Sequence, residues 1–357
     1  MSKSPLASMR ILVAAACCVL ALQHPVTAQE NRTWAIALHG GAGSIARDIP
    51  KERISEYRVA LNEALEAGTE VLKAGGSSLD AVQATVMKLE DNPLFNAGRG
   101  AVFDAGGRHQ MDASIMDGHK LRGGGISMVT ELKNPITAAR LVMEKTDHVL
   151  LAGQEAETFA KQNGCETVDP RYFFTRRRWD QLVRKLKATD RPAPKQPAYG
   201  FPPGTDSETD HTPPAEIGDT VGCVALDING HLAAATSTGG LTGKMLGRIG
   251  DSPILGAGSY ADDRSVAVSG TGRGEEFIRH SIAARVGWLV ADKGYSLDNA
   301  GKHCLTNVLS TGQGGLIAVD GQGNVFLGTN TGSMTRAWAK SDGTRGIGIW
   351  DEPLSND

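Results

Sequence analysis

Residues 218–240 read GDTVGCVALDINGHLAAATSTGG, and the chain is organised around this stretch. Two short apolar runs, 221–226 and 232–236, flank Asn229-Gly230, a dipeptide that favours the tight turn of a β-hairpin. The stretch before them, residues 188–219, carries seven of the chain's 15 prolines. Such a composition predicts an exposed, partly extended linker. The sequence therefore predicts a linker that meets a buried hairpin at Thr220.

The segments on either side of this stretch predict alternating strands and helices. Before the linker we expect strands at 33–38, 101–104, 110–116 and 125–130, and helices at 52–73, 78–89 and 136–144, with Ser78 or Asp80 capping the second helix. After the linker we expect helices at 275–293 and 297–309, and a second hairpin at 315–319 and 325–329. Either half alone would leave a sheet uncovered. We therefore expect one α+β domain in which two sheets pack face to face with helices outside.

Composition limits the classes of protein and partner. The chain has 357 residues, 40% of them hydrophobic, and a formal net charge of −3, which is typical of a soluble globular protein. Such a charge gives no overall field for nucleic acid. The basic and aromatic run 171–187 could contact nucleic acid or an anionic membrane. An amphipathic helix that leads into the linker is the favoured interpretation, so we expect no nucleic-acid partner.

The first 28 residues have the pattern of a secretory signal. Lys3 and Arg10 precede an apolar run at 11–22, and small residues end at Ala28 before Gln29. Twelve apolar residues are too few to span a bilayer, which needs about 20, although an N-terminal membrane anchor is the alternative. We expect a periplasmic or secreted protein that begins at Gln29 and does not contact the membrane.

Common catalytic and metal signatures are missing from the sequence. There is no phosphate-binding loop of the Walker type, no zinc-protease motif, no paired-cysteine motif and no serine-hydrolase elbow. After the signal, Cys165, Cys223 and Cys304 are too scattered for a disulfide framework. His39 ends an apolar strand, where a histidine is more often structural than catalytic. We therefore expect another group to supply a base.

Thr220 offers a base of its own. A threonine hydroxyl becomes a nucleophile when a base takes its proton, and the α-amine of an N-terminal threonine can be that base. Such an amine has a pKa of about 7.7–8.0 and is partly unprotonated at neutral pH. The amine exists only if the bond between Asp219 and Thr220 is cut. The alternative is that Thr220 simply begins a strand.

Six segments carry a resemblance to a known family. They are HGGAG at 39–43, NPLFNAGRGAVF at 92–103, MDASIMDG at 111–118, the stretch at 218–240, GRIGDSPILGAG at 247–258 and SGTGRGEEFIR at 269–279. Together they resemble the plant-type asparaginases, also called isoaspartyl peptidases, which are N-terminal nucleophile hydrolases. The resemblance runs from about Trp34 to Trp350. It implies a four-layer αββα sandwich, self-cleavage into an α subunit (29–219) and a β subunit (220–357), and assembly as (αβ)₂. It also implies hydrolysis of β-aspartyl peptides and L-asparagine with no catalytic cofactor.

The resemblance also assigns roles to individual residues. It implies that Thr220 is the nucleophile, with Thr238 contacting it and Asn96 and Gly41 lining its pocket. It implies that Arg248 and Asp251 form a clamp for the substrate's α-carboxylate and α-ammonium, and that the Gly274 carbonyl helps to hold the ammonium. It also implies that the Thr271 hydroxyl and the Gly272 N–H are the oxyanion donors. It further implies a structural sodium ion bound by the backbone carbonyls of Leu89, Glu90, Asn92, Phe95, Ala97 and Arg99.

The chemistry of the clamp agrees with this assignment. Arginine presents a planar fork that suits a carboxylate, and an acid three residues later suits an ammonium group. An Arg–Asp pair at this spacing is, however, more often a solvated ion pair. Asp219 departs from the family, where glycine commonly precedes the nucleophile, and Gly243, Met245 and Leu246 also replace commoner residues. The alternatives are a glycosylasparaginase and an unprocessed periplasmic binding protein that uses Arg248 and Asp251 without catalysis.

Overall fold

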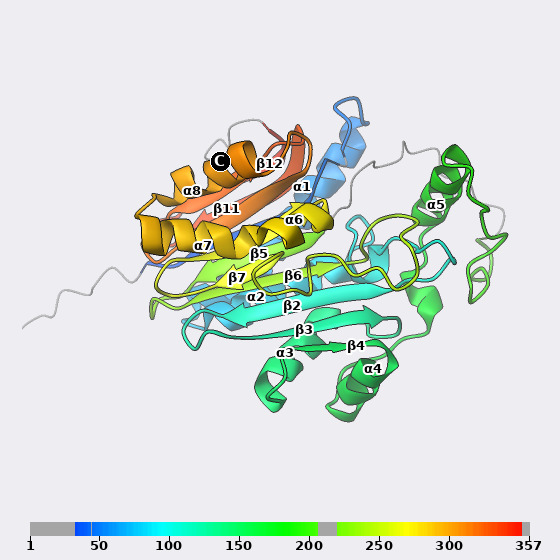
Figure 1. Ribbon diagram of the computed structural model, residues 1–357, viewed down its shortest axis with the longest axis horizontal. Coiled ribbons are helices and arrows are strands. Elements are labelled where there is room, and N and C mark those ends of the chain that lie inside the picture. The colour runs from blue at the N-terminus through cyan, green and yellow to red at the C-terminus, as the bar shows by residue number, and fades with distance from the viewer. Residues whose placement is uncertain (1–32, 44, 206–219, 352–357) are drawn as a thin grey trace, which may run out of the picture. The chain divides into compact units, whose positions relative to one another are not determined.

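The computed structural model describes residues 33–43, 45–205 and 220–351, and these belong to one compact unit (Figure 1). The predicted signal peptide, residues 1–28, and the predicted cleavage residue Asp219 lie outside the described residues. Within the described part, no helix combines the length and apolar character that crossing a membrane requires.

The larger sheet has eight strands, drawn from both sides of the linker. Their order across the sheet is β12 (Arg345–Trp350), β11 (Ser333–Lys340), β1 (Ala35–Ala42), β5 (Val221–Leu226), β6 (Leu232–Thr238), β2 (Met111–Asp117), β3 (Arg122–Val129) and β4 (Leu150–Ala152). Only the pair β3 and β4 is parallel. Strands β5 and β6 follow the linker and lie between β1 and β2, which precede it, so the strands of the two segments interleave. The two segments therefore share one hydrogen-bonded sheet.

The smaller sheet has four strands, all of which follow the linker. Their order is β10 (Val325–Thr329), β9 (Gly314–Asp320), β8 (Val266–Gly272) and β7 (Ser259–Ala261). Successive side chains of a strand point to opposite faces of its sheet. One face of the larger sheet can therefore pack against helices while the other packs against the smaller sheet. In β1, Ile36 and Leu38 join the core beneath the N-terminal helices, whereas Ala35 and Ala37 join the core between the sheets.

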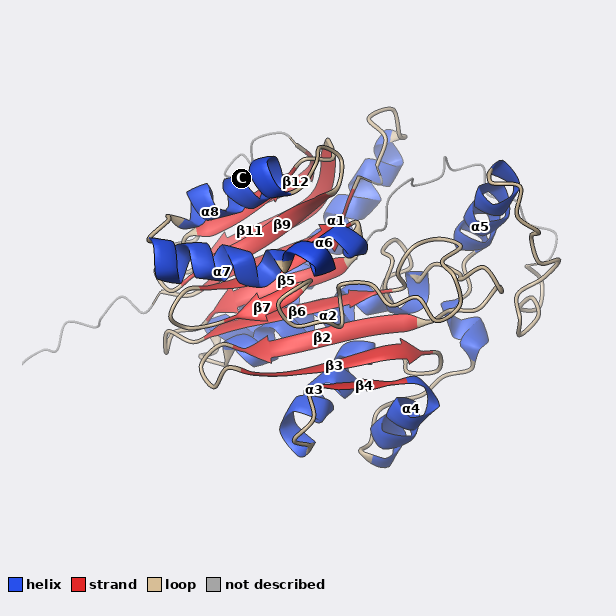
Figure 2. Ribbon diagram, in the orientation of Figure 1, coloured by secondary structure: helices blue, strands red, loops and turns tan. Residues whose placement is uncertain are grey.

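Helices cover the outer faces of both sheets (Figure 2). Helices α1 (Lys51–Lys73), α2 (Ser78–Asp91) and α3 (Pro135–Lys145) pack on the larger sheet. Helices α7 (Ile282–Lys293) and α8 (Leu297–His303) pack on the smaller sheet. Three further helices are α4 (Gly153–Gln162), α5 (Arg176–Ala188) and α6 (Gly274–His280). The predicted mixture of helices and packed sheets in one compact unit agrees with this structure.

Several predicted elements were wrong in detail. Residues 101–104 form no strand, because their backbone N–H groups bond within the loop, as when Val102 donates to the Asn96 side chain. The predicted helix 275–293 breaks at Ser281, whose φ of 50° is left-handed. The predicted helix 297–309 ends as a π-helical turn at Cys304–Val308. Helix α2 is capped by Ser77, whose Oγ accepts from the Asp80 N–H, and not by Ser78 or Asp80.

The first part of the predicted linker also differs from expectation. Residues 189–205 have no helix or strand, but Tyr199 and Phe201 pack against Phe103 and against Trp179 of α5. This part has no regular structure and is largely exposed, as predicted, but its aromatic side chains anchor it to the amphipathic helix. The helix predicted within 171–187 is confirmed. Residues 206–219 lie outside the described part.

Candidate active site

Thr220 precedes strand β5 and lies buried beside the end of strand β6. Its hydroxyl donates a hydrogen bond to the Thr238 hydroxyl, with 3.1 Å between the oxygens. The Thr238 oxygen also accepts from the Gly240 N–H at 2.9 Å. The pair predicted from sequence is therefore in contact. The bond from Gly240 fixes the oxygen of Thr238, and through it the Thr220 hydroxyl.

His39 holds the backbone of Thr220 from strand β1. Its Nδ1 lies 2.9 Å from the Thr220 carbonyl oxygen, and its Nε2 lies 2.9 Å from the Ser269 hydroxyl. Burial lowers the pKa of His39 to about 3, although the bond to Thr220 opposes this shift. The ring is therefore neutral at physiological pH. A carbonyl only accepts, so Nδ1 carries the proton and Nε2 accepts from Ser269.

Sequence reasoning gave no active-site role to His39, Ser269 or Thr236. The Thr236 and Ser269 hydroxyls lie 2.7 Å apart and continue the chain of hydrogen bonds behind Thr220. The available signal was the position of His39 at the end of an apolar strand. It became informative only once that strand paired with β5.

Asn96 orders the backbone that follows β6. Its side-chain nitrogen donates to the Gly240 carbonyl at 2.7 Å, and its backbone carbonyl accepts from the Gly239 N–H at 3.0 Å. Both glycines directly follow Thr238, so Asn96 orders the backbone beside the hydroxyl pair of Thr238 and Thr220. Gly41 lies in β1 at a bulge, with a φ of 117° that residues with a side chain rarely adopt.

Thr271 and Gly272 end strand β8. The Thr271 hydroxyl is buried and has no hydrogen-bond partner among the described residues. Gly272 has a φ of 139°, and a Cβ there would collide with the Gln313 carbonyl oxygen. A buried hydroxyl without a partner is costly, and such groups are uncommon away from binding sites. Thr271 is therefore available to a ligand.

The predicted clamp has two unpaired polar groups. Asp251 is 5% exposed, and burial raises the pKa of its carboxyl to about 7 despite the nearby Arg248. The Asp251 Oδ2 and Arg248 Nη2 atoms have no hydrogen-bond partner within the described part of the chain. A Cβ built on Gly274 would lie 2.6 Å from Asp251 Oδ1 and 2.9 Å from Arg248 Nη2. The missing side chain of Gly274 therefore leaves space between the two charged groups.

Arg248 has a partner that the sequence analysis missed. Its Nε lies 3.1 Å from Glu275 Oε1, so Glu275 holds one edge of the guanidinium and leaves Nη2 free. The arginine is thus not the solvated partner of Asp251. In the sequence, Glu275 lies in the segment SGTGRGEEFIR at 269–279, to which no role in holding Arg248 was assigned.

Gly258 connects the clamp with the hydrogen bonds behind Thr220. Its carbonyl oxygen lies 3.3 Å from the Thr236 hydroxyl oxygen and accepts from the Gly270 N–H at 2.8 Å. A Cβ on Gly258 would lie 2.8 Å from Asp251 Oδ2. Lys244, also missed, is buried nearby, donates to the Gln110 carbonyl and has its pKa lowered by burial. These contacts place the clamp in the same site as Thr220.

The residues predicted to bind sodium lie at the end of α2 and in the loop after it. Cβ atoms at Gly98 and Gly100 would collide with the carbonyl oxygens of Glu90 and Phe95, respectively, so these oxygens face space that only glycine leaves open. The carbonyls of Leu89, Asn92 and Ala97 each accept one backbone N–H and keep a second lone pair. Arg99 lies in the 3₁₀ turn Gly98–Gly100. Oxygen ligands of this kind fit a hard cation.

Known proteins were compared with the chain as a whole. A family model described as asparaginase matches residues 32–349. An isoaspartyl peptidase of Escherichia coli (strain K12) is 45% identical over 320 residues, which cover 89% of this chain and 96% of the relative. A probable isoaspartyl peptidase/L-asparaginase 2 of Arabidopsis thaliana is 43% identical, covering 89% and 99%. An isoaspartyl peptidase/L-asparaginase of Mus musculus is 39% identical, covering 89% and 91%. The chain therefore belongs to the asparaginase family.

Proposed function

We propose that this protein hydrolyses β-aspartyl peptides and L-asparagine with Thr220 as the nucleophile. The observation that carries the proposal is the buried hydroxyl of Thr220, held 3.1 Å from Thr238 where strand β5 begins. Self-cleavage between Asp219 and Thr220 would free the α-amine of Thr220. The names of the relatives, at 39–45% identity, support this substrate class.

The proposed reaction proceeds in two halves. The α-amine takes the proton of the Thr220 hydroxyl while the hydroxyl oxygen attacks the side-chain amide carbon of the substrate. The C–N bond breaks, the amine returns the proton to the leaving nitrogen, and an aspartyl ester of Thr220 remains. Water then attacks this ester, releases aspartate and restores the hydroxyl.

Two groups of strand β8 stabilise the charge that develops in each half. The unpaired Thr271 hydroxyl and the Gly272 N–H donate to the oxyanion of the tetrahedral intermediate. Donors fixed in advance at such a position contribute typically about 10²–10³ in kcat each. His39, held neutral, orients the backbone of Thr220 and leaves the proton transfer to the α-amine.

The clamp selects the free end of an aspartyl residue. Arg248 Nη2 pairs with the substrate α-carboxylate, while Asp251 and the Gly274 carbonyl take the α-ammonium. A β-linked aspartyl residue presents both groups, whereas an internal α-linked aspartate has both in peptide bonds. An α-linked substrate would leave buried polar groups unpaired, which can cost about 10⁴-fold in specificity.

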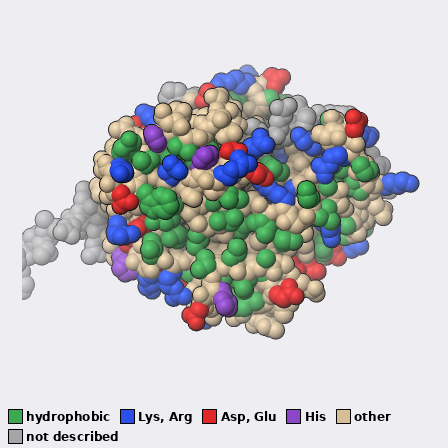
Figure 3. All heavy atoms as spheres, in the orientation of Figure 1, with side chains coloured by type: hydrophobic (Ala, Val, Ile, Leu, Met, Phe, Trp, Pro, Cys, Tyr) green, Lys and Arg blue, Asp and Glu red, His purple; other side chains and the backbone are tan. Residues whose placement is uncertain are grey.

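The arrangement of the whole protein is part of this proposal. The two sheets with helices on both outer faces would be the four-layer αββα sandwich of N-terminal nucleophile hydrolases. Hydrophobic side chains gather across the middle of one face (Figure 3), and such patches favour self-association, here as (αβ)₂. The loop at residues 89–99 would hold a structural sodium ion. The mature chain would begin at Gln29 and act in the periplasm or outside the cell.

Denaturing electrophoresis and N-terminal sequencing test the proposal. The native protein should give two fragments, and the smaller should begin Thr-Val-Gly-Cys. Thr220→Ala should remain one chain and release no aspartate. Arg248→Ala is the matched control: it should still cleave itself but lose most of its kcat/KM on β-aspartyl dipeptides, because the clamp holds substrate only.

The outcomes separate the alternatives. An intact native chain that binds aspartate would support a binding protein. Cleaved protein that acts on glycosylated asparagine but not on β-aspartyl dipeptides would support a glycosylasparaginase. Full activity in Thr220→Ala would exclude the proposed nucleophile.

A further inference from the structure

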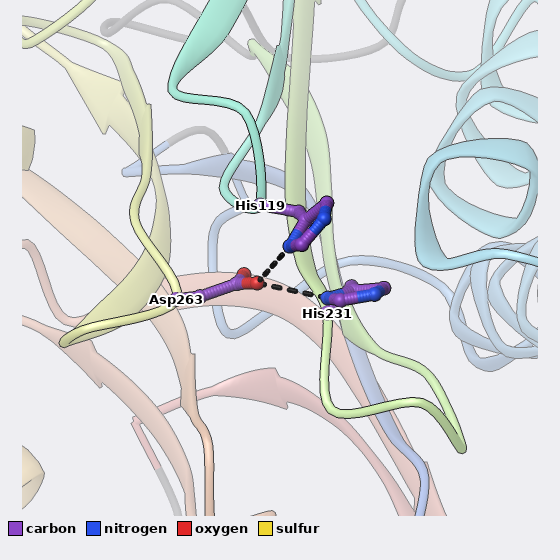
Figure 4. Close-up of side chains that lie close together, drawn as sticks. All are labelled: His119, His231 and Asp263. Carbon is purple, nitrogen blue, oxygen red and sulfur yellow. Dashed lines mark hydrogen bonds and ion pairs between the residues drawn. The ribbon is translucent and has the colours of Figure 1, made fainter.

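Three hairpin turns bring two imidazoles and a carboxylate together, away from the candidate active site. His119 lies in the turn between β2 and β3, His231 in the turn between β5 and β6, and Asp263 in the turn between β7 and β8. Both rings face the Asp263 carboxylate (Figure 4). The Nδ1 atoms of His119 and His231 lie 3.4 Å and 2.9 Å from Asp263 Oδ2.

The spacing of these three atoms suits a single metal ion. All three ligand atoms lie within 4.8 Å of one another. Zinc binds imidazole nitrogen and carboxylate oxygen at about 2.0–2.2 Å in tetrahedral geometry, so neighbouring ligand atoms of one ion are about 3.3–3.6 Å apart. The His119 Nδ1–Asp263 Oδ2 distance of 3.4 Å falls in this interval, and the His231 Nδ1–Asp263 Oδ2 distance of 2.9 Å, a hydrogen bond in the free site, would lengthen by about 0.4 Å. An ion could therefore enter with only small movements of the side chains.

Contacts around the cluster already fix the positions of the ligands. The second oxygen of Asp263 accepts from the Leu232 N–H at 2.8 Å, and this leaves Oδ2 directed at the imidazoles. Asp117 Oδ1 accepts from the His119 N–H at 2.9 Å and holds the first turn. The imidazole rings lie against each other with centroids 3.8 Å apart and their planes tilted by 40°. Hydrogen bonds to the residues that ligate a metal orient them and raise the affinity for the metal.

We propose that His119, His231 and Asp263 bind Zn²⁺. Two nitrogen donors favour zinc over Mg²⁺ and Ca²⁺, which prefer oxygen ligands. The side chain of His119 is 53% exposed and that of His231 is 36% exposed, so solvent can reach the ion and supply a water as fourth ligand. Three protein ligands with one water are a common zinc environment.

The site would stabilise the fold and take no part in the reaction at Thr220. Thr220 precedes β5 and His231 follows it, and a strand of six residues is about 20 Å long. Two of the turns belong to the larger sheet, while the turn with Asp263 belongs to the smaller sheet. A shared ion would therefore link the two sheets at the ends of the strands opposite Thr220.

Zinc binding to the full protein, made without a histidine tag, tests the proposal. After treatment with a chelator and dialysis, titration calorimetry should show one Zn²⁺ per chain, while Mg²⁺ and Ca²⁺ should show no binding at this site. At zinc concentrations about 100-fold above Kd, Tm should rise by roughly 3–8 °C. Such a shift follows because the ion binds the folded chain alone.

Two variants decide whether the cluster is responsible. His119→Ala should weaken zinc binding by more than about 100-fold, since loss of even a supporting contact costs about 10–100-fold, and should abolish the rise in Tm. His148→Ala is the matched control, because it removes another exposed histidine and should bind zinc normally. Absence of binding to the native protein, or equal binding by His119→Ala, would overturn the proposal. The Tm of zinc-free His119→Ala shows whether the variant is folded.

Discussion

At the scale of single residues, the site depends on polar groups that are buried without partners. Thr271, Asp251 and Arg248 each keep one atom unpaired among the described residues, although burial of such atoms is costly. A ligand that pairs all three atoms would remove this cost. The same burial that makes the free site unfavourable therefore makes it selective.

The ionisation of Asp251 gives a prediction about stability and pH. Burial raises the pKa of its carboxyl from an ordinary value of 3.8 to about 7 in the folded protein. Between these values the folded chain binds more protons than the unfolded chain, so this group makes the free energy of unfolding fall as pH rises from about 4 to about 7. The fall is at most about 1.4 kcal/mol per pH unit.

Urea unfolding of an uncleaved background, Thr220→Ala, measures this dependence. Asp251→Asn in that background should lose less stability than its parent between pH 4 and pH 7, because the amide does not ionise. Asp147→Asn, at an exposed carboxylate, is the control and should follow the parent. If the Asp251→Asn curve ran parallel to the parent's, the carboxyl would not be the group that titrates in this range.

At the scale of elements, the start of α2 is set by one side chain. Ser77 Oγ accepts from the Asp80 N–H at 3.1 Å and donates to the Asp80 carboxylate at 2.7 Å. This helix ends at Asp91, directly before the loop that contains Asn96. The cap therefore supports an element on which the site depends.

Replacing this cap should destabilise the protein measurably. Ser77→Ala should lower the free energy of unfolding by about 1 kcal/mol, within a range of about 0.5–2 kcal/mol, because an N–H of the first turn loses its acceptor. Ser55→Ala, at an exposed position inside α1, should be neutral or slightly stabilising, because alanine favours helix. Equal losses in the two variants, measured by urea unfolding, would argue against a capping role.

At the scale of the whole molecule, the shared sheet would determine whether the two proposed subunits stay together after the proposed self-cleavage. Strand β5 pairs with β1 on one side and β6 on the other, and β6 pairs with β2. Cleavage before Thr220 would therefore leave β1 and β2 in one subunit and β5 and β6 in the other, joined by the hydrogen bonds of adjacent strands.

The subunits should consequently remain together without denaturant. After signal removal they would span residues 29–219 and 220–357, which are 191 and 138 residues long. Size-exclusion chromatography of the cleaved protein should elute both in one peak, while denaturing electrophoresis should separate them. Separation of the two fragments in native buffer would contradict the interleaved sheet.

The sequence alone was sufficient for features that depend on neighbours along the chain. The hairpin of β5 and β6 follows from two apolar runs around Asn229-Gly230, and the helix predicted at 52–73 is found as α1. The clamp of Arg248 and Asp251 was implied by the resemblance of GRIGDSPILGAG to the family, because an Arg–Asp pair at this spacing is by itself more often a solvated ion pair. Such patterns act over a few residues and leave their signal in the local order of side chains.

The tertiary structure decided the contacts between distant segments. His39 reaches Thr220 across 181 positions and Ser269 across 230, and Glu275 holds one edge of Arg248 from the first turn of helix α6. His119, His231 and Asp263 likewise meet only because the turns β2–β3, β5–β6 and β7–β8 lie side by side at the same end of the two sheets. No local pattern encodes these contacts, because they depend on which strands pair and on how the two sheets pack. The burial that shifts the pKa values of His39 and Asp251 likewise arises only when the sheets have packed.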